Sequence, residues 1–198
     1  MKPLHTVRGQ AVSLPESNID TDIIYPARFL VVLTKTGLAE YAFHDRIAKD
    51  PDFPIHPGMT QPILVAGANF GSGSSREQAP WALADLGIRV IIAPSFGDIF
   101  HGNCFRNGLL PIRLPQDVVD QLHTAAQAGT EMEVSLVERA IHLADGDAPI
   151  LFDVPEDGRE ALLNGWNETT RILQNNLCDI EAFEQGQRAE SPWLWTRG

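Results

Sequence analysis

The spacing of hydrophobic residues divides this chain into a regular centre and two less regular flanks. Between residues 62 and 114, unbroken apolar runs alternate with stretches in which apolar residues recur every three or four positions. Short unbroken runs are typical of buried strands, and the three-to-four spacing is typical of amphipathic helices. Strands that alternate with helices indicate a parallel sheet with right-handed crossovers. The predicted strands are 62–68, 88–93 and 109–114, and the predicted helices are 76–86, 95–107 and 117–128.

The flank before this centre has a weaker pattern. Residues 5–14 alternate loosely between apolar and polar and predict a short strand, which Pro15 interrupts. Residues 18–26 predict a polar turn that enters an apolar segment. Residues 34–57 have little periodicity, so they predict a long loop with one helical turn, of a kind that often carries function.

The flank after the centre alternates apolar with polar residues, which is typical of strands with one buried face. Asp145-Gly146-Asp147 lies between two of these runs and is typical of a β-hairpin turn. Helices are predicted at 156–174 and 179–187. The sum is an α/β fold with added antiparallel strands, in a single domain 1–198 with a core at about 5–155 and a C-terminal helical extension at about 156–198. The alternating residues are Met132, Val134 and Leu136, then Ile141 and Leu143, then Ile150, Phe152 and Val154.

Charge and composition narrow the classes of partner. The formal net charge is −11 over 198 residues, with no basic stripe that could displace counterions from a nucleic acid. A small anionic substrate must therefore be attracted by a local site, against the field of the whole protein. Two cysteines are too few for a disulfide framework and indicate a reducing compartment. Residues 1–18 show no signal peptide, and the apolar run 29–33 is far shorter than a membrane helix, so we expect a soluble, cytoplasmic protein without a membrane partner.

The run Gly71-Ser72-Gly73-Ser74-Ser75-Arg76 is where chemistry can be argued from the residues alone. It fits a capping box with Ser75 at the N-cap and Gln78 at N3, or the same box one residue earlier, so the helix should start within 74–77. Free N–H groups there attract an anion, and Arg76 can bind a carboxylate or a phosphate with two hydrogen bonds. The alternative is a plain helix cap after a glycine turn, with Arg76 in solvent.

Other motifs fail on detail. A P-loop needs a lysine that this run lacks, and a nucleophile elbow needs Gly-x-Ser-x-Gly. A dinucleotide-binding fingerprint needs a third glycine where Arg76 stands, although Asp98 lies at a tolerable distance for a ribose ligand. The six histidines have no metal-ligand spacing, and Cys104 and Cys178 are too few to hold an iron–sulfur cluster. No metal site is therefore expected on this chain.

The central run resembles a known family. Residues 69–83, Asn-Phe-Gly-Ser-Gly-Ser-Ser-Arg-Glu-Gln-Ala-Pro-Trp-Ala-Leu, are similar to the signature of the swivelling domain of the aconitase superfamily, and look most like the small subunits of bacterial 3-isopropylmalate dehydratases. Residues 90–100 and 103–112 continue the likeness, and residues 18–30 match the N-terminal motif. The resemblance covers about residues 5–155.

The resemblance implies a three-layer β/β/α swivelling fold and a hydro-lyase of leucine biosynthesis that acts on a small hydroxy-dicarboxylate. It implies no cofactor on this chain and a [4Fe–4S] cluster on a partner large subunit, where the iron acts as a Lewis acid. By this resemblance Ser74 is expected to be the catalytic base. The residues expected to contact substrate are Ser75, Arg76, Asp22 and Arg28. A serine hydroxyl is a poor base unless positive surroundings stabilise its alkoxide, and a helix N-terminus and Arg76 would supply such surroundings.

The chain departs from the family pattern at three places, which bear on the substrate more than on the reaction. Gln78 stands where histidine is expected, Ser72 where cysteine is expected, and residues 164–173 differ from an expected Gly-Leu-Asp-x-Ile-Gly-Leu run. Three hypotheses follow. The first is interconversion of 2- and 3-isopropylmalate. The second is the same chemistry on citramalate, dimethylmalate or homoaconitate, and the third is a non-catalytic anion- or nucleotide-binding domain.

Overall fold

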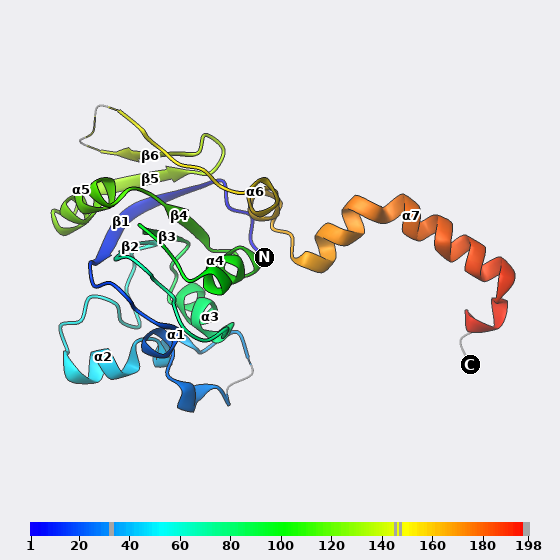
Figure 1. The fold of residues 1–198 in the computed structure, drawn as a ribbon, viewed down its shortest axis with the longest axis horizontal. Helices are drawn as coiled ribbons and strands as arrows, with labels where there is room; N and C mark the ends of the chain where they lie inside the picture. Colours follow the sequence, from blue (N-terminus) through cyan, green and yellow to red (C-terminus); the bar gives the residue numbers. More distant parts are fainter. Residues whose placement is uncertain (32–33, 145, 147, 196–198) are drawn as a thin grey trace.

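A curled seven-stranded sheet runs through the body of the protein in the computed structural model, which describes residues 1–31, 34–144, 146 and 148–195 (Figure 1). The strand order is β4-β3-β2-β1-β5-β6-β7. The strands are β1 (Thr6–Leu14), β2 (Ile63–Ala66), β3 (Val90–Ala93), β4 (Leu110–Arg113), β5 (Glu131–Ser135), β6 (Ala140–Leu143) and β7 (Ile150–Leu151).

The sheet has a parallel half and an antiparallel half that share β1. Strands β1 to β4 are all parallel, with Ala11 opposite Ile63 and Val90 opposite Leu110. Strand β5 pairs antiparallel with the other edge of β1, and β6 and β7 continue in the same sense. This confirms the predicted parallel centre with added antiparallel strands. Of the expected hairpin turn, residues 145 and 147 lie outside the described residues, but the strands it would connect do pair antiparallel.

Helices cover both faces of the parallel half. The helices in the described residues are α1 (Thr21–Ile24), α2 (His44–Lys49), α3 (Gln78–Asp85), α4 (Asp98–Arg106), α5 (Gln116–Gln127), α6 (Glu156–Asn164) and α7 (Glu168–Glu190), with 3-10 turns at Ala27–Phe29, Ala39–Tyr41 and Pro192–Leu194. Helix α7 does not cover the sheet but projects from the body. None of the helices in the described ranges is long and apolar enough to cross a membrane.

Alternation along the strands separates two hydrophobic cores. In β2, Leu64 and Ala66 face one core while Ile63 and Val65 face the other, because successive side chains of a strand point to opposite faces. The first core receives side chains from α1, α3 and α4, and the second from α5, α6 and the antiparallel strands. Since every residue of β2 and β3 is buried, these strands read as unbroken apolar runs in the sequence.

Two predicted segments differ from the structure. Residues 34–57 do not form a bare loop: they contain a 3-10 turn and α2, and they bury Leu38, Phe43 and Ile55 in the first core. The helix predicted at 156–174 is broken after α6, where Gly165 takes a positive φ of 69° and Asn167 caps the next helix. The last predicted helix, 179–187, lies in the C-terminal half of α7 and is not a separate element.

Candidate active site

Three loops meet at the carboxyl edge of the parallel strands. Because β1, β2 and β3 run in the same direction, the segments that follow them leave the sheet at one edge, where α/β proteins usually place their ligands. Backbone hydrogen bonds join the loop after β2 to both of its neighbours. The donor and acceptor pairs are Asn18 N to Ala68 O (2.8 Å), Gly71 N to Ile19 O (2.7 Å), Thr21 N to Ser72 O (2.9 Å), Phe70 N to Ser95 O (3.0 Å) and Gly97 N to Phe70 O (3.0 Å).

Two glycines allow these loops to approach so closely. A Cβ on Gly71 would lie 2.2 Å from Cγ of Phe100, and the residue has a φ of 70°. A Cβ on Gly97 would lie 2.5 Å from the Gly71 carbonyl oxygen. Neither distance is compatible with a side chain, so the path of the loop depends on both glycines.

The loop sets Ser74, Ser75 and Arg76 just before α3. The helix begins at Gln78, with Glu77 as an N-cap that makes no side-chain hydrogen bond, so neither capping box forms. Instead the Ser74 carbonyl accepts from Thr21 Oγ1 at 3.1 Å and from the Arg76 amide at 2.8 Å. The second bond closes a tight turn at Ser75, and the two serine side chains are exposed.

Backbone donors remain available beside the serine side chains. Within the described part of the chain, the amides of Gly73, Ser74 and Ser75 donate to no other backbone carbonyl. Amides without an internal partner are donors for an anion, as at other glycine-rich loops. Ser74 also lines a hollow of about 270 Å³ together with Gly71, Gly73, Gly97, Asp98, Ile99 and Phe100.

An ion pair joins the N-terminal motif to this loop. Nη1 of Arg76 contacts Oδ1 of Asp22, on α1, and the same oxygen accepts from the Ala27 amide at 3.2 Å. The Arg76 side chain is only 19% exposed, whereas Asp22 is 52% exposed. The structure therefore brings Asp22, Ser74, Ser75 and Arg76 together, with a half-buried cation held in a defined direction.

Arg28 is held elsewhere. Its guanidinium pairs with Asp45, lies 3.2 Å from Nδ1 of His44 and stacks 4.5 Å above the ring of Phe29. The hydrogen bond from Arg28 lowers the pKa of Asp45 to about 2. Asp45 shares a second hollow with Asp22, so the partner of Arg28 lies close to Asp22, but no hydrogen bond or ion pair links Arg28 to the serines among the described residues.

Comparison with known proteins identifies the family. The model of the aconitase C-terminal domain matches residues 1–117. The 3-isopropylmalate dehydratase small subunit of Rhodospirillum centenum is 45% identical over 202 residues, covering 98% of both chains. That of Bacillus pumilus is 46% identical over 206 residues, covering 98% of this chain and 99% of its own. The chain belongs to the family of 3-isopropylmalate dehydratase small subunits. The fold agrees with this, because a crystal structure of 3-isopropylmalate dehydratase from Methanocaldococcus jannaschii, 27% identical, matches 89% of this chain and 99% of its own with a TM-score of 0.69.

Membership of the 3-isopropylmalate dehydratase small-subunit family confirms the resemblance and the swivelling fold predicted from the sequence. Among the three hypotheses it favours the first and gives no support to citramalate, dimethylmalate or homoaconitate as substrates, or to a non-catalytic binding domain. The site residues transferred by resemblance remain predictions, which the geometry above makes specific.

Sequence reasoning missed three residues that shape this site. Thr21 holds the Ser74 carbonyl, while Gly97 and Asp98 line the same hollow as Ser74. A signal was present for the last two, because they lie at the end of the short connection between β3 and α4, and the ends of adjacent parallel strands share one edge. Nothing in the sequence pattern distinguished Thr21 from an ordinary turn residue.

The residues of this small-subunit family member do not fit a metal cluster. In the described ranges, no group of three or more His, Cys, Asp or Glu side chains is placed to hold a metal ion. Cys104 is fully buried in the first core, where burial raises the pKa of its thiol well above the ordinary value. Cys178 is exposed on α7. An iron–sulfur cluster normally needs about four thiolates, so this chain cannot ligate one alone.

Proposed function

We propose that the chain is the small subunit of a 3-isopropylmalate dehydratase and that, with a large subunit, it interconverts 2- and 3-isopropylmalate by dehydration and rehydration in leucine biosynthesis. The observation that supports this most is the meeting of Asp22 and the Ser74-Ser75-Arg76 loop at the carboxyl edge of the parallel strands. Two motifs separated by about fifty residues in the sequence form one site there. The enzyme would act in the cytoplasm.

The chain's own groups would bind and orient the carboxylate. The guanidinium fork of Arg76, the amides of Gly73 to Ser75 and the hydroxyl of Ser75 offer hydrogen bonds to an anion in one direction. Asp22 would fix the fork, because its Oδ1 holds Nη1 of the guanidinium. Such preorganised donors are worth most in a site from which water is excluded.

Ser74 would then move the proton. Its alkoxide form would take the proton from the carbon next to the bound carboxylate and become a neutral hydroxyl. The positive groups around the loop would stabilise the alkoxide before the transfer and the carbanion-like charge on the substrate after it. A [4Fe–4S] cluster on the large subunit would supply the Lewis acid for the departing hydroxyl. The exposure of Ser74 and Ser75 is consistent with a site that a second chain must cover. Arg28 would contact substrate only after leaving Asp45.

The decisive experiment is Ser74→Ala in the complex with the large subunit. The exposed hydroxyl can be removed without disturbing the fold, so the free energy of unfolding should stay within about 0.5 kcal/mol of wild type. Turnover should fall at least ~100-fold, as for the loss of a general base. Ser75→Ala is the matched control, and its main effect should be a higher KM.

Two outcomes contradict the proposal. Normal turnover by Ser74→Ala would remove the base assignment, and full activity of the isolated chain would remove the need for a large subunit.

A panel with citramalate, dimethylmalate and homoaconitate tests the substrate, because Gln78, the first residue of α3, stands two positions from Arg76. Isopropylmalate should have the highest kcat/KM.

A further inference from the structure

The C-terminal arm, defined as residues 168–195, leaves the body of the protein as a single helix and a terminal 3-10 turn. Figure 1 shows α7 projecting from the side of α6, away from α1 and the candidate active site. None of the 23 residues of α7 is buried. A helix of this length spans about 35 Å, so the arm reaches well beyond the rest of the chain.

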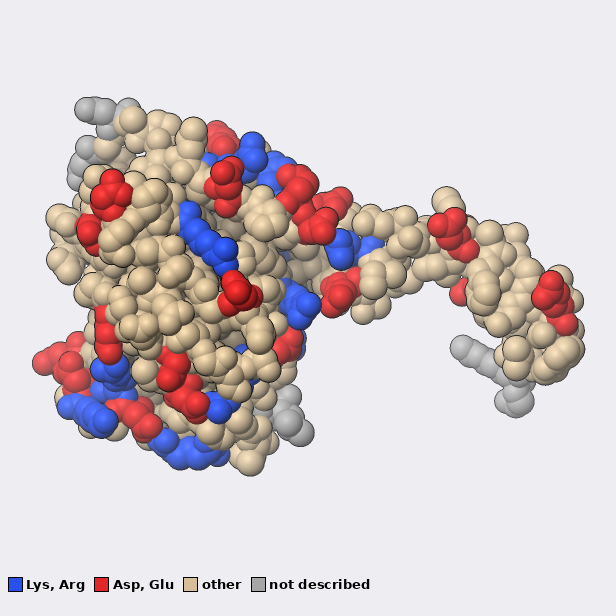
Figure 2. All heavy atoms as spheres, viewed as in Figure 1, with Lys and Arg blue, Asp and Glu red and all other residues tan. Residues whose placement is uncertain are grey.

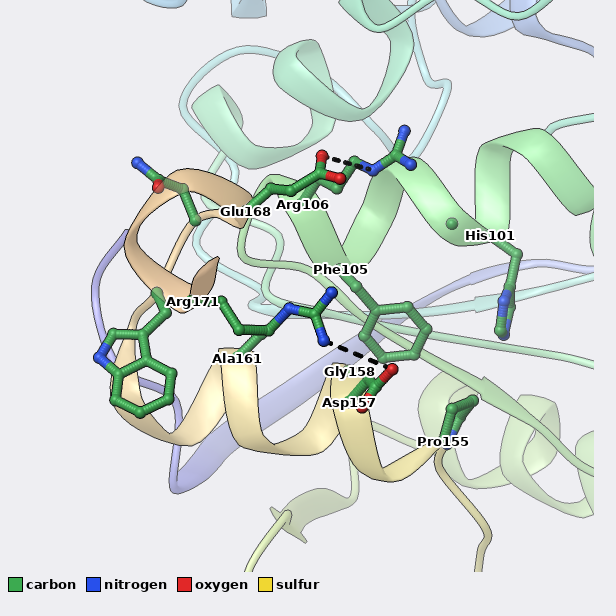
Figure 3. A pocket seen from close by; sticks show the side chains of 12 residues that line it. His101, Phe105, Arg106, Pro155, Asp157, Gly158, Ala161, Glu168 and Arg171 are labelled. Atoms are coloured by element: carbon green, nitrogen blue, oxygen red, sulfur yellow. Dashed lines mark ion pairs between the residues drawn. The ribbon is translucent and has the colours of Figure 1, made fainter. Parts of the chain in front are cut away.

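The root of the arm is fastened to the body. Glu168 pairs with Arg106 of α4 at 3.9 Å, and Arg171 pairs with Asp157 of α6 at 3.5 Å, across a pocket of about 320 Å³ (Figure 3). The side chain of Asn167 caps α7 by accepting from the Thr170 amide at 2.8 Å. The starting point and initial direction of the helix are thus set by contacts, whereas its length beyond the root lies free of the body.

One face of the arm is apolar. Leu177, Ile180 and Phe183 follow one another at i, i+3 and i+6, and Ile172 and Leu173 precede them before a kink at Asn176. We call these five residues the apolar stripe. Leu177 is 48% exposed and Phe183 is 68% exposed. A stripe with this spacing normally faces a core, and a long exposed one marks a surface for another protein.

The helix also needs external support. Asn176 has non-helical dihedral angles, and Gly186 lies in the helix interior, where glycine costs roughly 1 kcal/mol relative to alanine. Helices in proteins draw most of their stability from packing an amphipathic face. Within the described chain the 3-10 turn Pro192–Leu194 contacts the end of α7 and Arg188 stacks on Trp195, but no residue of α7 is buried. Packing its apolar face on a partner would therefore add stability that the free chain does not supply.

We propose that the arm docks the large subunit, with the apolar stripe lying in a groove of that chain. The inference rests on the proposed function, in which the chain works with a large subunit. The relatives named as small subunits match 98% of this chain, so their common length includes the arm. The arm lies apart from the active-site edge and gives the complex a second attachment, which strengthens association without a contact to substrate.

Charge disfavours a second copy of this chain as the occupant. Beyond its root the arm carries Asp179, Glu181, Glu184 and Glu190 against one arginine, Arg188. In Figure 2 the visible face of the arm is mostly uncharged, with scattered acidic groups in red. Two arms packed together would bring like charges into contact, whereas a groove with a basic rim on the large subunit would complement them. Helix-in-groove docking of this kind is a common mode of recognition.

The test compares two double variants in the full-length chain. Leu177→Asp with Phe183→Asp places two charges in the stripe, and Ala182→Asp with Ala189→Asp places the same charges on the opposite face of the same helix. Affinity for the large subunit of the same organism is measured by calorimetry, and hydrogen exchange of residues 168–190 is followed in the free chain and in the complex. The stripe variant should bind roughly a hundredfold more weakly than the control, and docking should slow exchange in wild type.

Activity separates this inference from the proposed function. At saturating large subunit the stripe variant should recover wild-type kcat, because every site residue is intact. If wild type with the large subunit shows no dehydratase activity, the proposed function fails. If wild type is active and the stripe variant binds as tightly as the control, the docking inference is overturned and the function stands. It is also overturned if the stripe variant only converts a dimer of the isolated chain to monomer.

Discussion

The loops at the candidate active site are tightly packed against one another, whereas the C-terminal arm is exposed along its length. Around Gly71, backbone hydrogen bonds to two neighbouring loops and contact with Phe100 leave no room for a methyl group. At Gly186, near the C-terminal end of α7, nothing lies within 4 Å of an added Cβ. The conformation of the loops is therefore determined by contacts within this chain, whereas that of the arm depends, in our proposal, on contacts with the large subunit.

The difference shows which part of the function each region can carry alone. A site that must orient a carboxylate requires donors fixed to a fraction of an ångström, and rigid loops supply them before substrate arrives. An arm that must find a partner requires reach and an apolar face, and these need no rigidity in the free subunit. Substitutions should therefore have large effects at the loops and small ones on the arm until the partner is present.

The largest effect is expected for Gly71→Ala. The new methyl group would overlap the ring of Phe100, and alanine is unfavourable at a φ of 70°, so the free energy of unfolding should fall by about 2–4 kcal/mol. Gly73→Ala is the control, since its φ is 90° but the nearest atom to its Cβ lies 3.6 Å away. Its free energy of unfolding should fall only by the cost of the positive φ for alanine, about 1–2 kcal/mol. Equal losses in urea unfolding would show that Phe100 moves aside freely.

Asp22→Asn should lower kcat/KM by roughly 10- to 100-fold in the complex. Arg76 would lose the carboxylate that sets its direction, while the half-exposed Asp22 contributes less than about 1 kcal/mol to stability. Asp45→Asn removes the ionised partner of Arg28 and should have a smaller effect. A larger effect for Asp45→Asn would identify Arg28, rather than Arg76, as the main substrate contact.

The free energy of unfolding should fall in acid because of His101, which lines the pocket at the root of the arm. Burial, and then the charge of Arg113, lower the pKa of its imidazole to about 4, with Asp98 opposing. The ordinary pKa is near 6.5, so between pH 6.5 and 4 the unfolded chain binds a proton that the folded chain does not, and stability falls as pH falls. His101→Gln should reduce this loss by about 1 kcal/mol, because solvent screens part of the penalty. The free energy of unfolding is measured in urea between pH 7 and 4.5. The same dependence on pH in wild type and in His101→Gln would contradict this role of His101.

The smallest effect is expected for Gly186→Ala. The arm is not packed on the body, so global unfolding of the free chain should change by less than about 0.5 kcal/mol. The helical signal in circular dichroism should rise slightly, because alanine favours the helix interior. A loss above 1 kcal/mol would mean that the arm packs against the body in solution.

The regular part of the fold was predictable because local pattern and global burial agree there. Strands such as β3 are buried on both faces, and helices such as α5 keep a clear apolar spacing between a proline and Gly129. The segment 34–57 was predicted as a loop because Leu38, Phe43 and Ile55 enter the core without any regular period. Such residues are recruited by tertiary contact alone, which a periodicity argument does not detect.

The site was predictable as a set of residues but not as an arrangement. Ser74, Ser75, Arg76 and Asp22 do come together, yet the capping box predicted around Ser75 is absent because α3 begins only at Gln78, and Thr21, from a distant part of the chain, holds the loop through the Ser74 carbonyl. Arg28 was transferred to the site with the N-terminal motif, and its pairing with Asp45 depends on α2, a helix whose position the sequence did not indicate.

The shared strand β1 has a consequence for how the protein is made. Thr6 pairs with Ser135 on one edge of β1, and Ala11 pairs with Ile63 on the other. During synthesis the first edge stays without its partner until more than a hundred further residues have left the ribosome, which takes roughly ten seconds at typical elongation rates. Strand β1 thus waits for its antiparallel partner long after it has emerged, and the nascent chain carries an open sheet edge throughout that interval.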